Sequence, residues 1–229
     1  MSTVTDILTA SGISSDKCKK FEEFANMLKT ANKSFNLTRI TDDESMARLH
    51  FLDSISPVVL GLIPENAKII DVGTGGGFPS IPLAILLDNA EITAVEASEK
   101  KLGFVKSVSD ALGLGIECVC ARAEELAHTS YRESYDICVS RAVASMSMLL
   151  ELLSPFAKVG GRLLCYKGQN CAEELELSKD APAKLSLSKP KIYPAGIDGV
   201  DHVIAEYEKL SKLAKTYPRR FAKIKSDPL

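Results

Sequence analysis

The sequence predicts an α/β fold, in which a doubly wound, mostly parallel sheet carries an N-terminal helical layer and a C-terminal antiparallel hairpin. After Pro64, short apolar runs alternate with helical stretches, as in parallel strands joined by crossover helices. A glycine-rich turn follows the first of these runs, and a carboxylate ends the second. The first sixty residues lack this alternation and are expected to be mostly helical.

The N-terminal layer is expected to contain two main helices. The first covers about residues 16–33, where apolar side chains recur at helical spacing: Phe21, Phe24, Ala25, Leu28 and Ala31. Thr41 and Glu44 have the spacing of a capping box, which predicts a second helix through Met46, Leu49 and Leu52.

The sheet is expected to contain five parallel strands and a hairpin. The five strands are predicted at 67–72, 91–96, 116–120, 135–140 and 162–166, with helices at 79–87, 99–112 and 145–157. The segments 185–193 and 200–207 are separated by Pro194, Gly196 and Gly199, and we expect them to form a hairpin at one edge of the sheet.

Composition bounds the class of protein. With 229 residues, 45% hydrophobic and 25% charged, the chain is an ordinary globular protein that buries one substantial core. No apolar run is long enough to span a bilayer, and no basic segment precedes an apolar one at the start, so we expect a cytoplasmic protein.

The cysteines predict neither a disulfide framework nor a metal centre. None has CxxC spacing, and four lie in apolar, strand-like stretches where a thiol packs as a small hydrophobe: the six are Cys18, Cys118, Cys120, Cys138, Cys165 and Cys171. Cys118 and Cys120 would share a strand face, but three scattered histidines offer them few further ligands. We therefore expect reduced core cysteines and no metal.

The most specific motif is the turn Gly73-Thr74-Gly75-Gly76-Gly77-Phe78, which follows a strand ending in Asp71-Val72 and precedes a helix. Glycines are needed where backbone approaches a ligand closely or where φ is positive. The first turn of a doubly wound sheet lies near the switch point, where nucleotide-like ligands bind. Glu96 ends the next strand 19 residues after Gly77, and its carboxylate can accept both ribose hydroxyls of an adenosine.

The third glycine separates two classes of ligand. A dinucleotide fingerprint reads GxGxxG, but Phe78 occupies the place of its last glycine. The GxGxG spacing of Gly73, Gly75 and Gly77 after Asp71 instead resembles the glycine loop of class I methyltransferases, which bind S-adenosylmethionine.

The resemblance extends from about Asn36 to the C-terminus. Besides the glycine turn with Phe78-Pro79, the segments that carry it are Asn36-Leu37-Thr38, His50-Phe51-Leu52-Asp53-Ser54, Arg122-Ala123-Glu124, Ser140-Arg141-Ala142-Val143-Ala144 and Tyr217-Pro218-Arg219-Arg220. Their order is similar to that in the ribosomal RNA small subunit methyltransferase G family, also called glucose-inhibited division protein B. This resemblance implies methyl transfer from S-adenosylmethionine to N7 of a guanine in 16S ribosomal RNA.

The same resemblance implies positions for the cofactor. Gly73 and Phe78 would line its methionine side, Ala123 and Glu124 would lie near the adenine, and Arg141 would stand at the mouth of the site. With the residues singled out above, the candidate cofactor site comprises Gly73, Gly75, Phe78, Glu96, Ala123, Glu124 and Arg141. Without the resemblance, Ala123 and Glu124 would be read as an ordinary helix start.

Little catalytic machinery is expected, because guanine N7 already holds a free lone pair and alignment matters more than a base. Ser140-Arg141-Ala142-Val143 stands where enzymes that methylate exocyclic amines have a Pro-Pro-aromatic motif, and there is no Pro-Cys pair of the kind used against cytosine C5. If a side chain orients the target, Arg141 is the first candidate and Asp53 or Lys167 the second. For Asn36 and His50, a capping or surface role is preferred.

The net charge is only −2, but the charge is unevenly distributed. Seven Lys or Arg and no acid lie between Lys209 and Lys225, with Tyr217 and Phe221 interleaved, which could provide both phosphate pairing and a stacking surface. The candidate RNA-binding residues are Arg39, Arg48, Lys167, Tyr217, Arg219, Arg220, Lys223 and Lys225.

The chain is thus expected to divide into an N-terminal helical accessory segment (1–63), an S-adenosylmethionine-binding methyltransferase domain (64–208) and a basic C-terminal tail (209–229). We expect a monomer whose partner is small-subunit ribosomal RNA or a subunit particle, with no membrane partner. Three alternatives stay open: a methyltransferase for another RNA, a small molecule or a protein; a non-catalytic RNA-binding module; and an NAD-dependent oxidoreductase.

Overall fold

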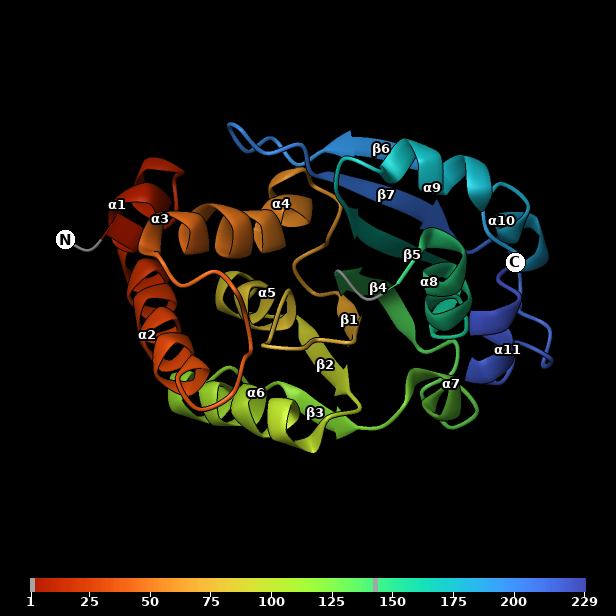
Figure 1. Cartoon of the computed structure of the whole chain (residues 1–229), viewed down its shortest axis with the longest axis horizontal. Helices are drawn as coiled ribbons and strands as arrows, with labels where there is room; N and C mark the ends of the chain where they lie inside the picture. The colour runs from red at the N-terminus through yellow and green to blue at the C-terminus, as the bar shows by residue number, and fades with distance from the viewer. Residues whose placement is uncertain (1–2, 142–143) are drawn as a thin grey trace.

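The structure is a computed structural model that describes residues 3–141 and 144–229. A sheet of seven strands forms the centre of this part of the chain (Figure 1). The strands are β1 (Lys68–Val72), β2 (Glu91–Glu96), β3 (Glu117–Cys120), β4 (Tyr135–Arg141), β5 (Ala157–Lys167), β6 (Lys191–Pro194) and β7 (Val203–Glu208). Their order is β3-β2-β1-β4-β5-β7-β6; β1 to β5 are parallel, whereas β7 runs antiparallel to β5 and β6. The predicted fold class is confirmed.

The strand order places a switch point between β1 and β4. From β1 the chain winds outward to β2 and β3, and then returns to β4 on the other side of β1. Crossovers that leave in opposite directions open a crevice at the carboxyl ends of the two central strands. The residues that end β1, β2 and β4 at this edge are Val72, Glu96 and Arg141. Ala142 and Val143, named above in the segment after β4, lie outside the described residues.

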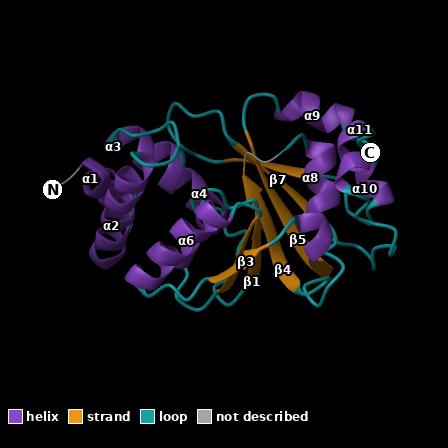
Figure 2. Ribbon diagram, turned by 60° about the horizontal axis from the view of Figure 1, so that its bottom comes forward, coloured by secondary structure: helices purple, strands orange, loops and turns teal. Residues whose placement is uncertain are grey.

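Helices cover both faces of the sheet (Figure 2). Alternate side chains of the strands enter two cores, one on each face. Ile69 and the N-terminal helices share one core with α5 (Ser80–Leu86) and α6 (Glu99–Leu112). Ile70, its neighbour, lies in the other core with α7 (Ala123–Leu126), α8 (Met146–Leu153), α9 (Cys171–Leu177) and α10 (Ala181–Lys184). A last helix, α11 (Phe221–Ser226), packs on α8.

The N-terminal layer covers the first core and reaches the glycine turn. It consists of α1 (Thr3–Ala10), α2 (Ser15–Asn32), α3 (Asp43–Ser45), the π-helix η1 (Met46–Leu52) and α4 (Asp53–Val59). Phe24 of α2 is fully buried, and its ring lies 5.2 Å from that of Phe78. The helix predicted over 16–33 is therefore confirmed, whereas α1 was not predicted.

Three local predictions are wrong. The helix cap is Asp42, not Thr41: the Asp42 side chain accepts a hydrogen bond from Ser45 N (2.8 Å), because Asp is an equally good cap one residue later. The helix expected over 145–157 ends at Leu153, since Pro155 disfavours helical backbone before it, and β5 then begins at Ala157. The first hairpin strand, expected over 185–193, begins only at Lys191.

The C-terminal segment is attached to the body through polar contacts. Arg132 donates to the carbonyl oxygens of Leu213, Ala214 and Tyr217. Arg219 pairs with the fully buried Glu151 of α8 through its backbone N–H and its guanidinium. The division into segments 1–63, 64–208 and 209–229 stays a prediction.

The described residues contain neither a candidate membrane span nor a candidate metal cluster. No helix there is both long and apolar enough to cross a membrane. In the same residues, no group of three or more His, Cys, Asp or Glu side chains could hold a metal ion.

Gly77 should be required for folding. Its φ is +92°, and a Cβ there would lie 2.2 Å from Ile81 Cδ1 of α5, so Gly77→Ala should lower the free energy of unfolding by about 1–3 kcal/mol. Gly103 of α6 is the matched control, because nothing lies within 4 Å of its added Cβ and Ala is the better helix former. Denaturant unfolding of both variants checks this; equal stability of the two would contradict the packing argument.

Candidate active site

A cavity of about 490 Å³ opens at the carboxyl ends of β1, β2 and β4. The glycine turn and Glu96 form its middle. The segment from Ala121 to Glu124, which includes the start of α7, forms another part of its wall. Thr38, His50 and Arg141 lie at the side of the N-terminal layer. Further lining residues are Leu37, Val72, Phe78, Val95, Ala97, Lys101, Leu152 and Phe221. The residues proposed as cofactor ligands from the sequence thus line one cavity.

The glycines of the turn have different physical roles. Gly73, Gly75 and Gly77 all have positive φ (77°, 58° and 92°), which side chains rarely adopt. A Cβ on Gly77 would collide with Ile81, so this glycine serves packing. A Cβ on Gly75 would contact only Gly73 O, at 3.9 Å, and Gly75 lines the cavity. Gly75 therefore leaves space that a ligand can occupy close to the backbone.

Glu96 is held at the end of β2 as an acceptor. Its Oε2 accepts from Gly75 N (3.1 Å) and its Oε1 from Ser98 N (2.9 Å). Each carboxylate oxygen has about two acceptor sites, so both oxygens keep capacity for a further donor. Two neighbouring ribose hydroxyls match this arrangement.

Asp71 supports the turn from beneath and does not line the cavity. It is fully buried, and its Oδ2 accepts from Ser80 N (3.1 Å) at the start of α5, next to the hydrogen-bonded pair Thr74 and Ser80. Burial raises the pKa of its carboxyl to about 6. Asp71 thus fixes the turn but is not a ligand for a molecule in the cavity.

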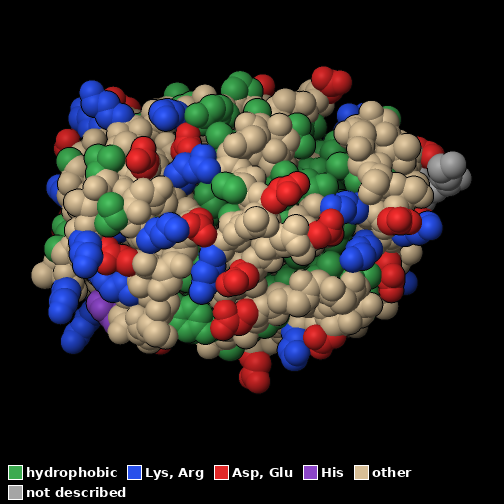
Figure 3. All heavy atoms as spheres, turned by 180° about the vertical axis from the view of Figure 1, so that it is seen from behind, with side chains coloured by type: hydrophobic (Ala, Val, Ile, Leu, Met, Phe, Trp, Pro, Cys, Tyr) green, Lys and Arg blue, Asp and Glu red, His purple; other side chains and the backbone are tan. Residues whose placement is uncertain are grey.

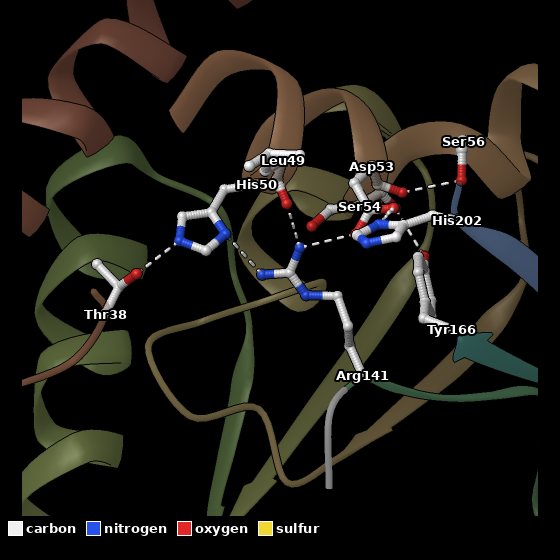
Figure 4. Close-up of polar contacts among 9 residues, drawn as sticks. All are labelled: Thr38, Leu49, His50, Asp53, Ser54, Ser56, Arg141, Tyr166 and His202. Carbon is white, nitrogen blue, oxygen red and sulfur yellow. Dashed lines mark hydrogen bonds and ion pairs between the residues drawn. The ribbon is translucent and has the colours of Figure 1, made fainter. Parts of the chain in front are cut away.

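Arg141 connects the end of β4 to the N-terminal layer (Figure 4). Its Nη1 donates to Asp53 Oδ2 (3.0 Å) and to Leu49 O (2.9 Å), and its Nη2 donates to His50 Nδ1 (3.0 Å). Asp53 is 2% exposed and also accepts from His202 Nδ1 (2.9 Å). The guanidinium carbon lies 4.9 Å from the centre of the Phe78 ring, a cation–π contact. These contacts fix both the position and the charge balance of Arg141.

The hydrogen bonds of His50 define its protonation state. A guanidinium can only donate, so Nδ1 is the unprotonated acceptor, and Nε2 carries the proton donated to Thr38 Oγ1 (2.7 Å). Burial and the Arg141 charge lower the pKa of His50 to about 4. The ring also stacks on Phe78, with centroids 4.4 Å apart. His50 is thus a neutral residue at neutral pH that orients both Arg141 and Thr38.

The Leu49 carbonyl that accepts from Arg141 lies in a π-helical turn. In a π-helix the hydrogen bonds run over five residues, and single π turns occur frequently at functional sites. The turn η1 carries Leu49 and His50 and leads directly into Asp53 of α4. One short segment therefore supplies every polar partner of Arg141 named above.

A second cavity of about 940 Å³ adjoins the first, and His50 and Arg141 line both. Its other polar lining groups include Asp53, Tyr166, Lys167 and His202. Lys167 Nζ donates to Glu174 Oε2 (2.6 Å) and Ala144 O (2.8 Å). The bond to Asp53 raises the pKa of His202 above its ordinary value. The two cavities meet at the His50–Arg141 pair.

Comparison with known proteins assigns this arrangement to a family. The family model described as rRNA small subunit methyltransferase G matches residues 17–199. The chain is 37% identical to the Ribosomal RNA small subunit methyltransferase G of Clostridium perfringens (strain 13), over 93% of this chain and 91% of that protein. It is 38% identical to the protein of the same name from Caldanaerobacter subterraneus subsp. tengcongensis, over 91% and 89%. The chain belongs to the rRNA small subunit methyltransferase G family.

A solved structure agrees with the fold of this family member. The O-methyltransferase from Bacillus cereus, solved in complex with SAH, superposes with a TM-score of 0.57 at 16% identity, covering 82% of this chain and 91% of that one. The methyltransferase family uses S-adenosylmethionine as cofactor. The open backbone at Gly75, the acceptor pair of Glu96 and the apolar wall near Ala123 fit this cofactor.

The candidate RNA-binding residues do not form one continuous surface. Arg39 is exposed, and Arg48 pairs with Glu44. Lys167 is buried in the second cavity with Glu174, and Arg219 is held by Glu151. In the C-terminal segment Tyr217 is half-buried, Arg220 and Lys225 are exposed, and Lys223 pairs with Asp227. Their role in RNA binding stays a prediction.

His50 lies in the site and not at the surface. The expectation of a capping or surface role for this residue is wrong, because its side chain is buried between Phe78 and Arg141; Asn36 is exposed, as expected. The sequence did contain one indication that His50 belongs to the site: it lies three residues before Asp53, in a segment that resembles the family. Thr38 and Phe221 were also not assigned to the cofactor cavity, although both line it.

The buried neutral His50 should make stability fall in acid. Its pKa is about 4 when folded and 6.5 when unfolded, so its contribution is fully present above pH 6.5 and is lost as pH falls toward 4. The variant His50→Asn keeps an acceptor, because its amide oxygen can replace Nδ1, but it has no group that titrates here. As pH falls from 6.5 to 4, its free energy of unfolding should therefore decrease by roughly 2–4 kcal/mol less than that of the parental protein. Urea unfolding from pH 7 to 4 measures this. The raised pKa of Asp71 changes stability with pH in the opposite sense, but equally in both proteins, so it cancels in the comparison. If the free energies of unfolding of the two proteins changed in parallel with pH, the neutral state assigned to His50 would be contradicted.

Proposed function

We propose that this chain transfers the methyl group of S-adenosylmethionine to N7 of a guanine in 16S, small-subunit ribosomal RNA. The observation that carries the proposal is the meeting of two cavities at Arg141 and His50. The first cavity has the residues to hold the cofactor: Gly73, Gly75, Phe78, Glu96, Ala123 and Glu124. The second is large enough for a nucleoside and opens beside the first.

The chemistry suits a site without a general base. S-adenosylmethionine supplies a methyl group on a positively charged sulfur. Guanine N7 attacks the methyl carbon with a free lone pair, the carbon–sulfur bond breaks, and positive charge passes to the base. Since no proton must leave first, the chain has to align the base and provide a suitable electrostatic setting.

Arg141 is placed to do both. Three of its N–H groups are used by Leu49, His50 and Asp53, so two of the five donors of a guanidinium remain for a ligand. Guanine O6, an acceptor adjacent to N7, is a suitable partner for such a donor. Asp53 balances the charge of Arg141, so the base receives a hydrogen bond without a net positive charge opposing the charge it gains.

The remaining contacts with RNA are assigned to exposed cations. Lys and Arg side chains gather at the end of the molecule that carries α7 and α11, whereas both signs of charge alternate over the middle of the face shown in Figure 3. Arg220 and Lys225 are exposed in the C-terminal segment, and Arg39 is exposed in the N-terminal layer. Arg219 is excluded from this role, because its guanidinium is already bonded to Glu151. The substrate is RNA, either alone or within the subunit.

Methylation of small-subunit RNA in vitro tests the proposal. The protein is incubated with S-adenosylmethionine and with 16S RNA, free or in subunits, and borohydride reduction followed by aniline cleavage then locates 7-methylguanosine. We expect one cleaved guanine, and a kcat at least about tenfold lower for Arg141→Lys, which keeps the charge but loses the planar fork. The unfolding free energy of the variant is the control for folding. A methyl group on a ribose or an exocyclic amine, or on a small molecule instead of RNA, would contradict the proposal.

A further inference from the structure

The first residue of α11, Phe221, lines the cofactor cavity together with Leu152 of α8 and Ala123 of α7. Phe221 is 36% exposed, although large apolar residues are usually buried. The helices α7, α8 and α11 lie together at the C-terminal end of the molecule (Figure 1). An accessible phenyl ring therefore faces a cavity at the side opposite His50 and Arg141.

The backbone that presents this ring is firmly held. Arg132 Nη1 donates to Tyr217 O (2.9 Å), and its Nη2 donates to Leu213 O and Ala214 O (both 3.2 Å). On the other side of Phe221, Ile224 is fully buried. The chain is thus anchored on both sides of Phe221, the residue of this segment that lines the cavity.

Arg219 makes the strongest of these attachments. Its backbone N and its Nε donate to Glu151 Oε1 (both 2.9 Å), and its Nη2 donates to Oε2 (2.6 Å). Glu151 is fully buried, and Leu152, the next residue of α8, lines the cavity. Paired, charge-assisted hydrogen bonds of this kind set both position and orientation. The pair fixes Phe221 relative to the cavity wall formed by α8.

The position of the ring indicates which part of the cofactor it meets. The family resemblance assigns the methionine end to Gly73 and Phe78. Glu96 offers acceptors for the ribose, which leaves the adenine for the wall formed by Ala123, Leu152 and Phe221. A flat heteroaromatic base gains most from an aromatic face that is still accessible. We propose that Phe221 binds the cofactor by packing on its adenine, and that Arg219 is a positioning residue for that ring. The proposal rests on the cofactor assigned to the site above.

This role differs from the one expected for the segment. In the sequence, Phe221 and Tyr217 suggested a stacking surface for RNA bases among cations. In the structure Tyr217 packs into the second core, and Phe221 lines the cofactor cavity. The segment therefore couples the C-terminus to cofactor binding.

Calorimetry with S-adenosylhomocysteine and methylthioadenosine tests the contact. Phe221→Ala should weaken binding of both ligands by the same factor, about tenfold, and Phe221→Leu should weaken it less, because the apolar area remains but the aromatic face is lost. Ser226→Ala, in the same helix, is the matched control and should bind like the parental protein, because Ser226 is exposed and does not line the cavity. Unchanged affinity for both ligands in a folded Phe221→Ala variant would overturn the proposal. A loss for S-adenosylhomocysteine alone would overturn the placement at the adenine.

Fluorescence gives a second readout that needs no activity. The chain contains no tryptophan, so Phe221→Trp introduces a single reporter at the site. Its emission should change saturably with S-adenosylhomocysteine, with the dissociation constant found by calorimetry. Val159→Trp is the control, because Val159 is exposed on β5 and does not line this cavity. A silent Phe221→Trp in a protein that binds the ligand would contradict the contact.

A double-mutant cycle tests the positioning role of Arg219. Arg219→Lys keeps the charge but loses the paired geometry, and should weaken S-adenosylhomocysteine binding severalfold in the parental protein and not in the Phe221→Ala background. An equal loss in both backgrounds would show that Arg219 acts on the fold alone. Failure of the parental protein to bind the ligand would instead remove the assigned cofactor, so the two failures are distinguishable.

Discussion

The buried salt bridge between Arg141 and Asp53 is the constraint on which the site depends. It joins the end of β4 to the start of α4, 88 residues apart in sequence, and so attaches the N-terminal layer to the switch point of the sheet. Both side chains are largely removed from water, at 13% and 2% exposure. A buried charge requires a partner, so the loss of either group would leave the other unpaired and costly. His50 bonds to the same guanidinium and in turn contacts Thr38 and Phe78.

This constraint also divides the site by function. On one side of Arg141 and His50 the glycine turn, Glu96 and the walls of α7, α8 and α11 surround the cofactor cavity. On the other side Tyr166, Lys167 and His202 surround the second cavity. The N-terminal layer and the C-terminal segment thus contribute side chains to a site whose centre is the sheet. Both segments pack against the sheet and its helices and line the cofactor cavity.

The sheet and the glycine turn could be predicted from sequence, because strand periodicity and glycine spacing are local properties. Glu96 could also be placed, since it ends a strand at a known edge of the sheet. The places of His50 and Phe221 could not be predicted, because they depend on contacts between distant parts of the chain. His50 lies on a π-helical turn, which has no recognisable residue pattern, and the segment that carries Phe221 is held by the pairing of Arg219 with Glu151. The sequence of basic residues between Lys209 and Lys225 does not indicate that Arg219 pairs with Glu151.

A double-mutant cycle on Arg141 and Asp53, followed through the free energies of unfolding, measures how strongly the bridge joins the N-terminal layer to the sheet. The four proteins are the parental chain, Arg141→Met, Asp53→Leu and the double variant. If the bridge holds the layer to the sheet, each single variant should lose about 3–5 kcal/mol, and the double variant should lose less than the sum of the two, with a coupling of at least about 1 kcal/mol. Losses that add to within about 0.5 kcal/mol would contradict the account.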